Sequence, residues 1–473
     1  MVEDREGLLQ KARKFENAIA RSSSEKENIL ILSHYGADGI CASALVQNHI
    51  LKHGGHSQIR FLGRPGKREL EKARAGNYDL LMLLDLGSGI TEALSRIFGD
   101  KWLSVDHHEI EPEEMETPNL LNPFQFQYDG SKDACSSTLC YYITEKTRNV
   151  QSAFLSTVGA LGDEQDRGQR RSLLSLNSTV IDEDSSTLKS IDSSVDLLFV
   201  GRETVPIHES IATTTACYIP GLTGNKDACL ASLRGAGVDL KSATRWRTIS
   251  DLTEDEKQKV LEAIVPHLQG TVVSVNDLVG SLYFLSSEDE FSPIRNARDF
   301  ASLLNSLGRL GSPGIGISLC LGGEGEAQNA VESALLEYRT ELIRTVQTLL
   351  SSEDRILEKS SYVLVVGDGI VSDRLGGACC QILSTLSRAK NKVILLRTTT
   401  PEGEVKFSAR QREYSSEGYD LGSLFSSLSK SVGGIGGGLR NVAGARFSIA
   451  KQQEFQTGVD AILQNQKPTL RQS

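Results

Sequence analysis

The chain has no long apolar run. Nowhere in its 473 residues do about 18 apolar residues follow one another, so the sequence offers no ordinary transmembrane helix. The first residues, Met-Val-Glu-Asp-Arg-Glu, are polar and lack the charged, apolar and small-residue order of a secretory leader. We therefore expect the protein to be cytoplasmic.

Cysteine occurs without any CxxC pair. Among the eight cysteines the close spacings are Cys135 with Cys140 and the adjacent Cys379 and Cys380, and neither matches a zinc or thiol redox pattern. We expect reduced thiols in apolar surroundings. Disulfide scaffolds and thiolate zinc modules are thereby disfavoured.

An excess of positive charge is also missing. The net charge of -10 argues against a basic protein that binds nucleic acid over its whole surface. Residues 361–473 are different, because they hold 14 Lys and Arg against 9 Asp and Glu. This basic C-terminal part is suited to contact phosphate groups.

Short apolar runs alternate with helical patterns in the first third of the chain. Strands are expected at 28–33, 58–62, 79–84 and 102–105, and helices at 5–20, 38–53, 67–75 and 89–97. Continuous apolar runs of this length are typical of strands buried on both faces. The alternation predicts an α/β fold with a doubly wound parallel sheet.

The remaining chain predicts further domains, as its length requires. We expect a first domain over 1–190, an inserted, mainly helical middle domain over 191–326, a connector helix within 327–355 and a smaller α/β domain over 356–473. In the middle domain, helices are predicted at 254–268 and 297–307, and a short strand at 315–321. In the last domain, strands are predicted at 361–367 and 392–397, and a glycine-rich loop at 433–444.

Residues that can bind metal ions follow several of the predicted strands. An Asp-His-His triplet closes the run 102–105, and such a triplet is rare by chance. The other candidates follow the runs 28–33 and 79–84 or lie after a helix that begins near residue 152. The full set of candidate ligands and neighbours is His34, Asp38, Asp85, Asp106, His107, His108 and Asp163. In an open α/β sheet, loops at the carboxyl ends of the strands form the functional crevice.

Each candidate has a structural alternative when it is taken alone. Asp38 could cap the helix that follows it, and Asp85 could be a turn residue before Gly87. His34, His107 and His108 could be ordinary structural histidines. Their joint occurrence at successive strand ends favours a metal site, and carboxylates with imidazole suit Mn²⁺ or Mg²⁺ better than zinc.

These motifs resemble those of the DHH phosphoesterase superfamily. The resemblance rests on residues 34–39 (HYGADG), 85–87 (DLG), 106–108 (DHH) and 162–163 (GD). The glycine-rich loop 433–444 resembles the C-terminal motif of the DHH-associated domain. Residues 219–224 and 301–311 resemble the archaeal RecJ-like nucleases, which include the nuclease that associates with the GINS replication complex.

The resemblance implies roles for individual residues. Asp38, Asp85, His107 and Asp163 would hold one Mn²⁺, and Asp85 would bridge to a second ion. His108 would face the scissile phosphate, with Asp106 orienting the histidine pair. Two metal ions would activate water and stabilise both oxygens of the displacement. The implied activity is a single-strand exonuclease acting on DNA or RNA in replication or repair, with a GINS-like complex as a partner.

The C-terminal domain supplies candidates for phosphate binding. Backbone N–H groups of Gly436, Gly437 and Gly438 could cradle a phosphate, and Arg440 adds positive charge. Arg410 is a further candidate. The alternatives are a hairpin loop for the glycines and an exposed surface charge for Arg410.

Two positions depart from the family pattern. Family members usually carry an aspartate where this chain has Gly36, and a histidine where it has Leu439. No later histidine replaces the second group, because the last one in the sequence is His267. The departures leave two functions open, a weakened nuclease or a non-catalytic subunit of a replication complex that keeps the nuclease fold. Small-substrate phosphatases share the metal motifs but usually lack the long middle region.

Overall fold

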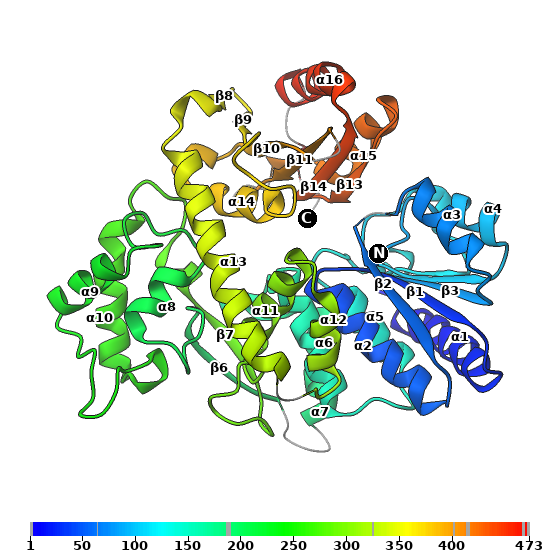
Figure 1. The fold of residues 1–473 in the computed structure, drawn as a ribbon, viewed down its shortest axis with the longest axis horizontal. Coiled ribbons are helices and arrows are strands. Elements are labelled where there is room, and N and C mark those ends of the chain that lie inside the picture. Colours follow the sequence, from blue (N-terminus) through cyan, green and yellow to red (C-terminus); the bar gives the residue numbers. More distant parts are fainter. Residues whose placement is uncertain are drawn as a thin grey trace. The chain divides into compact units, whose positions relative to one another are not determined.

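The computed structural model describes residues 3–63, 65–185, 191–323, 326–400, 403–412, 417–465 and 469–470. The chain forms two compact units (Figure 1). The first unit consists of Met1–Asp196 and Gly280–Leu335, and the second of Leu197–Val279 and Leu336–Ser473. None of the helices in the described part of the chain is long and apolar enough to cross a membrane.

The first unit contains a five-stranded parallel sheet in the order β2-β1-β3-β4-β5. Its strands are β1 (Ile29–His34), β2 (Ser57–Leu62), β3 (Leu80–Leu84), β4 (Trp102–Val105) and β5 (Leu120–Leu121). The predicted doubly wound parallel sheet is confirmed. Because β2 and β3 flank β1 on opposite sides, the chain order reverses between β1 and β3, and the crevice outside their carboxyl ends is the expected place for a site.

Successive residues of each strand face opposite sides of the sheet, and in β1, β3 and β4 both sides are buried, whereas the edge strand β2 is partly exposed. Ile31 of β1 and Leu84 of β3 belong to the larger core, whereas Leu30 and Leu83 face a smaller core. The smaller core is covered by α3 (Lys67–Ala75) and α4 (Thr91–Phe98). This two-sided burial explains why the strands read as continuous apolar runs.

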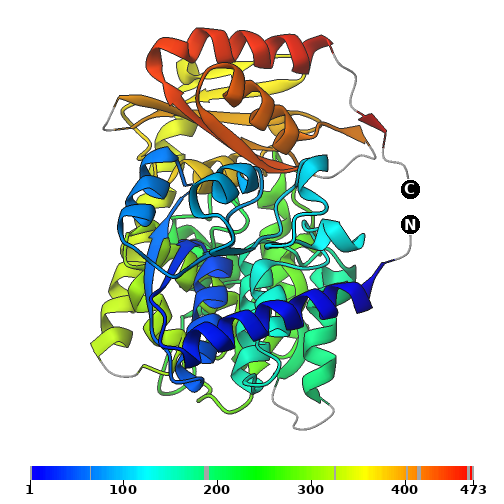
Figure 2. The same ribbon diagram turned by 90° about the vertical axis from the view of Figure 1, so that its right-hand side faces the viewer.

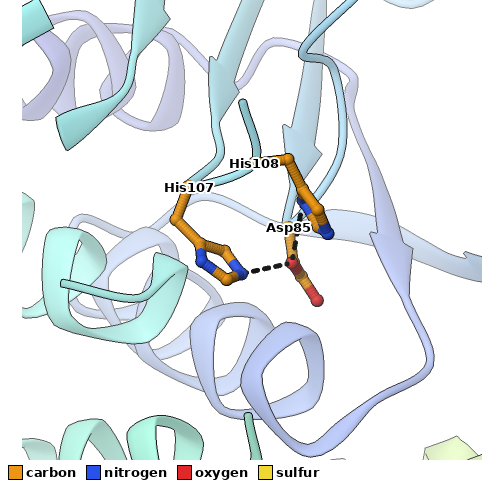
Figure 3. A group of neighbouring side chains, drawn as sticks. All are labelled: Asp85, His107 and His108. Atoms are coloured by element: carbon orange, nitrogen blue, oxygen red, sulfur yellow. Dashed lines mark ion pairs between the residues drawn. The ribbon is translucent and has the colours of Figure 1, made fainter. Parts of the chain in front are cut away.

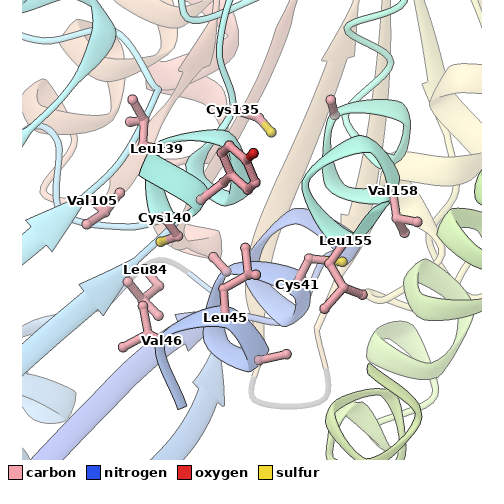
Figure 4. Packing of buried hydrophobic residues seen from close by; sticks show 14 of the residues in the cluster. Cys41, Leu45, Val46, Leu84, Val105, Cys135, Leu139, Cys140, Leu155 and Val158 are labelled. Carbon is pink, nitrogen blue, oxygen red and sulfur yellow. The ribbon is translucent and has the colours of Figure 1, made fainter. Parts of the chain in front are cut away.

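The larger core is built from helices that the site also uses. They are α1 (Arg5–Ser24), α2 (Ala37–Lys52), α5 (Ser136–Ile143), α6 (Val150–Gly162) and α7 (Ser175–Ser185). Figure 4 shows Cys41 and Leu45 of α2 gathered with Leu155 of α6 and with Leu84 and Val105 of the sheet. All eight cysteines lie in described residues, are buried and form no disulfide, as expected from their spacing.

The segment after residue 280 returns to the first unit. The strand β7 (Val279–Leu285) pairs with β6 (Ile191–Leu197), and α11 (Ala297–Arg309) and α12 (Pro313–Cys320) pack on α6 and α2. The predicted middle domain 191–326 is therefore divided between the two units by its contacts, and the proposed domain boundaries stay a prediction.

The predicted strand at 315–321 is wrong, because these residues form most of α12. Pro313 occupies the first turn of that helix, where its missing N–H costs no hydrogen bond. Gly316 lies against Leu304 and Ile40, so a helix face rather than a strand face meets the core. A short apolar run does not distinguish these two structures by its periodicity.

The described residues of the second unit include two hydrophobic clusters, one in each of two parts of the unit. Residues 197–279 form a mainly helical part with α8 (Ile207–Thr213), α9 (Lys226–Gly235) and α10 (Glu254–Ile264) around one core. The long helix α13 (Glu326–Leu350) leads into the other part, and its predicted extent is confirmed. That part holds a six-stranded sheet in the order β13-β14-β11-β10-β9-β8, in which the pair β9 and β10 is parallel and the other pairs are antiparallel.

Helices cover both faces of this sheet. The strands are β8 (Ile356–Glu358), β9 (Tyr362–Val366), β10 (Val393–Thr399), β11 (Glu404–Arg410), β13 (Ile435–Leu439) and β14 (Val442–Ser448). One face packs on α15 (Leu421–Ser431) and α16 (Gln452–Asn465), which Figure 2 shows in orange and red along the sheet. The helix α14 (Gly376–Leu383) packs against β10 and β11.

The predicted glycine-rich loop 433–444 is wrong as a loop, because it forms the hairpin of β13 and β14. The glycines let β13 lie close to α15, since a Cβ on Gly436 would be 2.0 Å from Ser429 Oγ. Gly438 has φ +155°, a conformation that side chains disfavour. Glycine repeats suggested a loop here, although they serve a close strand-to-helix contact.

Candidate metal centre

Asp38 lies in the first turn of α2 and is fully buried. It does not cap its own helix, because the N-cap position is Gly36. Its two carboxylate oxygens instead accept hydrogen bonds from the backbone N–H groups of Ser136 and Ser137, each at 2.8 Å. These N–H groups open α5, so the positive end of that helix holds the carboxylate in place.

Asp85 follows β3 directly and is buried. Its backbone is left-handed, with φ +58°, and this strained conformation is characteristic of functional sites. Oδ2 lies 3.1 Å from His34 Nδ1, and Oδ1 lies 3.4 Å from His107 Nε2. Oδ1 is buried and has no hydrogen-bond partner. Asp85 is therefore more than a turn residue.

His107 is fully buried, and its two ring nitrogens have different surroundings. Nδ1 lies 2.6 Å from the carbonyl oxygen of Gly130, an acceptor only, so Nδ1–H is the donor. Nε2 is buried without a hydrogen-bond partner and faces carboxylates. It lies 3.0 Å from Asp163 Oδ2 and 3.9 Å from Asp38 Oδ2. This imidazole is oriented as a metal ligand would be.

The carboxylate of Asp106 orients the groups next to it, which are the His107 backbone, the His108 ring and the Ser88 backbone. Oδ1 accepts from the backbone N–H of His107 at 2.8 Å and lies 2.7 Å from His108 Nδ1, while Oδ2 accepts from Ser88 N–H at 2.8 Å. Burial raises the pKa of Asp106, but His108 outweighs this and lowers the pKa well below its usual value. Figure 3 shows His107 and His108 both facing Asp85. The side chain of His108 is 30% exposed, so it is accessible from outside the cluster.

Four of the predicted ligands come together. One ligand atom from each lies within 4.8 Å of all the others, and the four residues are Asp38, Asp85, His107 and Asp163. A second, overlapping group consists of Asp85, His107 and His108. Both groups lie in the first unit, at the carboxyl ends of β3 and β4 and beside α2 and α6.

The three carboxylates of this cluster favour the binding of a cation. Burial, together with the nearby charges of Asp85 and Asp163, raises the pKa of Asp38 to about 6. Burial lowers the pKa of His107, yet the adjacent carboxylates of Asp163 and Asp85 raise it well above its usual value. Protons are thus drawn to a site with three carboxylates. A divalent ion fits there, because it would satisfy both unpartnered atoms, His107 Nε2 and Asp85 Oδ1.

His34 contacts the cluster from its edge. It ends β1, is partly exposed, and belongs to neither group of possible ligands among the described residues. Burial lowers its pKa, but the hydrogen bond and charge of Asp85 outweigh this and raise the pKa. A Cβ on Gly36 would lie 3.0 Å from His34 Nδ1, so the imidazole borders the place where the family's usual aspartate would begin.

Comparison with known proteins matches three domains in chain order. A model of the DHH family N-terminal domain matches residues 28–161, a model of the DHH-CID domain matches 198–279, and a model of the DHHA1 domain matches 359–465. The chain belongs to the DHH superfamily.

Relatives of this DHH protein extend over nearly all of it. An uncharacterized protein of Methanocaldococcus jannaschii is 26% identical over 453 residues, which are 93% of this chain and 94% of that protein. The structure of CDC45 from Entamoeba histolytica is 12% identical, with a TM-score of 0.60, over 95% of this chain and 98% of that one. Together with the similarity to a RecJ structure, these similarities show that the chain has a RecJ-like DHH fold.

A RecJ from Thermus thermophilus, in complex with Mn²⁺, is 14% identical with a TM-score of 0.56. The match covers 98% of this chain, which spans 56% of that RecJ. At such identities the comparison concerns the fold alone.

The predicted phosphate-binding residues of this DHH protein all lie in the second unit. Gly436, Gly437 and Gly438 are in β13, and Arg440 is in the turn of the hairpin. Arg410 ends β11, where its Nε donates to Gln381 Oε1 at 3.1 Å. Their role in binding phosphate stays a prediction.

Several contributing residues were missed in the sequence. Ser408 lies two residues before Arg410 on the same face of β11, and both approach the first turn of α14. A Cβ on Gly376 would be 3.4 Å from Ser408 Oγ, and one on Gly377 would be 3.4 Å from Arg410 Nη2. The alternation of strand residues could have paired Ser408 with Arg410. Asn305 lies within the segment 301–311 that carries the family resemblance, but nothing in that segment linked it to Ala37 beside the candidate ligand Asp38. No local signal pointed to Gln165, which contacts His107.

Proposed function

We propose that this protein is a metal-dependent phosphodiesterase that digests single-stranded DNA or RNA as an exonuclease, with Mn²⁺ or Mg²⁺ as its ion. The observation that carries the proposal is the buried cluster of three carboxylates and one imidazole, in which His107 Nε2 and Asp85 Oδ1 have no hydrogen-bond partner. Hard oxygen ligands with one imidazole favour these ions.

Asp38, Asp85, His107 and Asp163 would hold the ion. A bound divalent ion supplies Lewis acidity and a more acidic water for attack on a phosphodiester. The chain's own groups prepare the site. The N-terminus of α5 fixes the carboxylate of Asp38, and the Gly130 carbonyl fixes the ring orientation of His107. The contact of Asp106 with Nδ1 fixes the ring orientation of His108.

His108 would contact the phosphate of the substrate. Its Nδ1 is engaged by Asp106, so Nε2 is the ring nitrogen that would face a phosphate oxygen. Water exclusion at the neighbouring His107 is strong, since that side chain is 1% exposed. The partly exposed and the buried histidine therefore have separate tasks, substrate contact and metal binding.

The DHHA1 domain would bind the nucleic-acid backbone. Its excess of basic residues is suited to phosphates, and Ser408 and Arg410 meet at the start of α14. The side chain of Arg440 in the hairpin turn is a further contact. A single-strand binding surface of this kind depends on charge and predicts that binding weakens with salt.

The test is the release of mononucleotides from an end-labelled single strand with Mn²⁺ present. We expect cleavage by the wild type and none by a double variant, His107→Ala with Asp85→Ala. Equal signals from the two proteins would contradict the proposal. Labels at either end give the polarity, DNA and RNA strands give the substrate, and a length series separates an exonuclease from a small-substrate phosphatase.

A second candidate is a non-catalytic subunit that binds a GINS-like replication complex. The observation that favours it is the loss of two family side chains, at Gly36 and Leu439. It predicts co-purification with a GINS-like partner and nucleic-acid binding that does not depend on metal. Activity restored by Gly36→Asp with Leu439→His would identify a degenerated nuclease, and the Cβ added at residue 36 would lie 3.0 Å from His34 Nδ1.

A further inference from the structure

Asn305 joins the two helices that carry Asp38 and Asp163. Its Oδ1 accepts a hydrogen bond from Ala37 N–H at 2.9 Å, and its Nδ2 donates to the carbonyl oxygen of Gly162 at 3.1 Å. Ala37 precedes Asp38 at the start of α2, and Gly162 precedes Asp163 at the end of α6. One carboxamide therefore bridges the residues directly before two candidate ligands.

These two backbone groups need a partner from outside their helices. The first N–H groups of an α-helix and its last carbonyl groups have no partner within the helix. Ala37 is the first residue of α2, so its N–H has no acceptor within that helix. Asn305 satisfies one such group at each helix and does so from a helix 268 residues away from Ala37.

The junction between the two helices is tight. A Cβ on Gly162 would lie 2.5 Å from the Cβ of Ala37, and 3.5 Å from Asn305 Nδ2. Ala37 is fully buried. A small shift of either helix end would therefore alter both hydrogen bonds and the separation of the ligands that follow.

Two further residues of α11 contact the same segments. Arg298 Nη1 forms an ion pair with the buried Asp166 at 2.7 Å, three residues after Asp163. A Cβ on Gly308 would be 1.8 Å from the carbonyl oxygen of Tyr35, in the segment between His34 and Asp38. The helix α11 thus packs closely against both ligand-bearing segments.

We propose that Asn305 is a positioning residue of the metal centre, which sets the spacing of Asp38 and Asp163 for a divalent ion. The proposal rests on the metal site of the proposed function and adds a residue that acts through the backbone beside the ligands. Residues of this kind, which orient ligands from behind, typically change metal affinity by about 10- to 100-fold when removed.

The experiment measures Mn²⁺ binding by calorimetric titration of the full chain, without substrate. The test variant is Asn305→Ala. The matched control is Asn296→Ala, which removes an asparagine from the same helix. Asn296 caps α11, and its side chain accepts from Arg298 N–H at 3.0 Å rather than bridging Ala37 and Gly162. We expect both variants to melt at a lower temperature and Asn305→Ala alone to raise the Mn²⁺ dissociation constant, by about tenfold or more.

Hydrogen exchange provides a readout that does not depend on the ion. The amide of Ala37 should exchange faster in Asn305→Ala than in Asn296→Ala, because only the first loses the acceptor. If Asn305→Ala does not fold, Asn305→Asp serves instead, since it keeps the acceptor and loses the donor to Gly162. It should bind Mn²⁺ more weakly although it adds a negative charge.

The outcomes separate the two proposals. A wild type that binds no Mn²⁺ contradicts the proposed function and this inference with it. A wild type that binds Mn²⁺, with equal dissociation constants for the Asn305 and Asn296 variants, overturns this inference alone. Weaker binding confined to the Asn305 variants supports it.

Discussion

The imidazole of His107 donates from Nδ1 to the carbonyl oxygen of Gly130 at 2.6 Å. This single hydrogen bond fixes the tautomer and leaves Nε2 bare among the carboxylates. A ring that could rotate would spend part of its time with the wrong atom toward the cluster. The carbonyl of a residue outside the DHH motif thus decides which nitrogen is available to a metal.

Removal of that nitrogen should abolish metal binding. In His107→Ala the site retains three carboxylates that repel one another, so we expect Mn²⁺ to bind about 100-fold more weakly or not at all. The measurement is a calorimetric titration, with His267→Ala as the control. His267 lies in the second unit and contacts Ser232 and Pro220 instead. Loss of binding in the control as well would show that the effect is not local.

Metal affinity should fall as the pH is lowered through about 6. The pKa of Asp38 is raised to about 6, so below that value a proton must leave before an ion binds. We expect the dissociation constant for Mn²⁺ to rise at least about tenfold for each pH unit below 6, because the ion must displace a proton from Asp38 and also from His107, whose pKa is raised. Titrations between pH 5 and 8 test this. An affinity that is constant from pH 5 to 7 would contradict the ionisation of Asp38 as the cause.

The same shift predicts the pH dependence of the metal-free protein. The folded-state pKa of Asp38 lies above the ordinary value of 3.8, so its protonation favours the folded state. That contribution is fully present below pH 3.8 and is lost as the pH rises through about 6. In melting experiments, Mn²⁺ should therefore stabilise the protein more at pH 7 than at pH 5. Equal stabilisation at both values would count against it.

Asp106→Asn should separate metal binding from turnover. The amide keeps one oxygen for its neighbours but loses the charge that holds His108 by Nδ1. We expect Mn²⁺ binding to change little and the turnover rate to fall by about 10- to 100-fold. Single-turnover cleavage of a labelled strand measures this. Equal losses of metal binding and cleavage would show that Asp106 holds the ion's ligands rather than the substrate-facing histidine.

Gly159→Ala should displace the Asp38 carboxylate or the start of α5. Its Cβ would lie 2.7 Å from Asp38 Oδ1 and 2.1 Å from Ser137 Oγ, so the carboxylate or α5 must shift. We expect the free energy of unfolding to fall by about 1 to 3 kcal/mol, with weaker Mn²⁺ binding. The control is Gly314→Ala in α12, where a Cβ would meet nothing within 4 Å. There alanine should be neutral or stabilising by up to about 1 kcal/mol.

The sequence predicts those parts of the centre whose positions depend only on a few neighbouring residues. The strand before Asp85 is buried on both faces, so its residues are continuously apolar, and the ligand follows the last of them. Asp163 was found by its short motif at the end of α6. Such features need only a window of a few residues, because strand ends and helix ends place side chains by backbone geometry alone.

The remaining parts depend on contacts between distant segments. The residues of α12 are apolar or small on every side, so the sequence alone predicts a strand there. Only the contact of Gly316 with Ile40 shows which face is buried. The glycines at 433–444 predict a loop, but the segment is a hairpin. Glycine is needed there because β13 packs closely against α15. No pattern near residue 305 announces a bond to Ala37. Tertiary packing carries this information, and a single sequence does not record it.

The place of α11 in the chain has a consequence for synthesis. A ribosome that has completed residues 1–196 has made all four candidate ligands, yet the asparagine that bridges the helices of Asp38 and Asp163 lies more than a hundred codons ahead. The nascent N-terminal half can fold its sheet while its metal centre is still open on one side. Completion of the centre is thereby linked to synthesis of the intervening domain, and a product that terminates before residue 305 lacks the bridging asparagine.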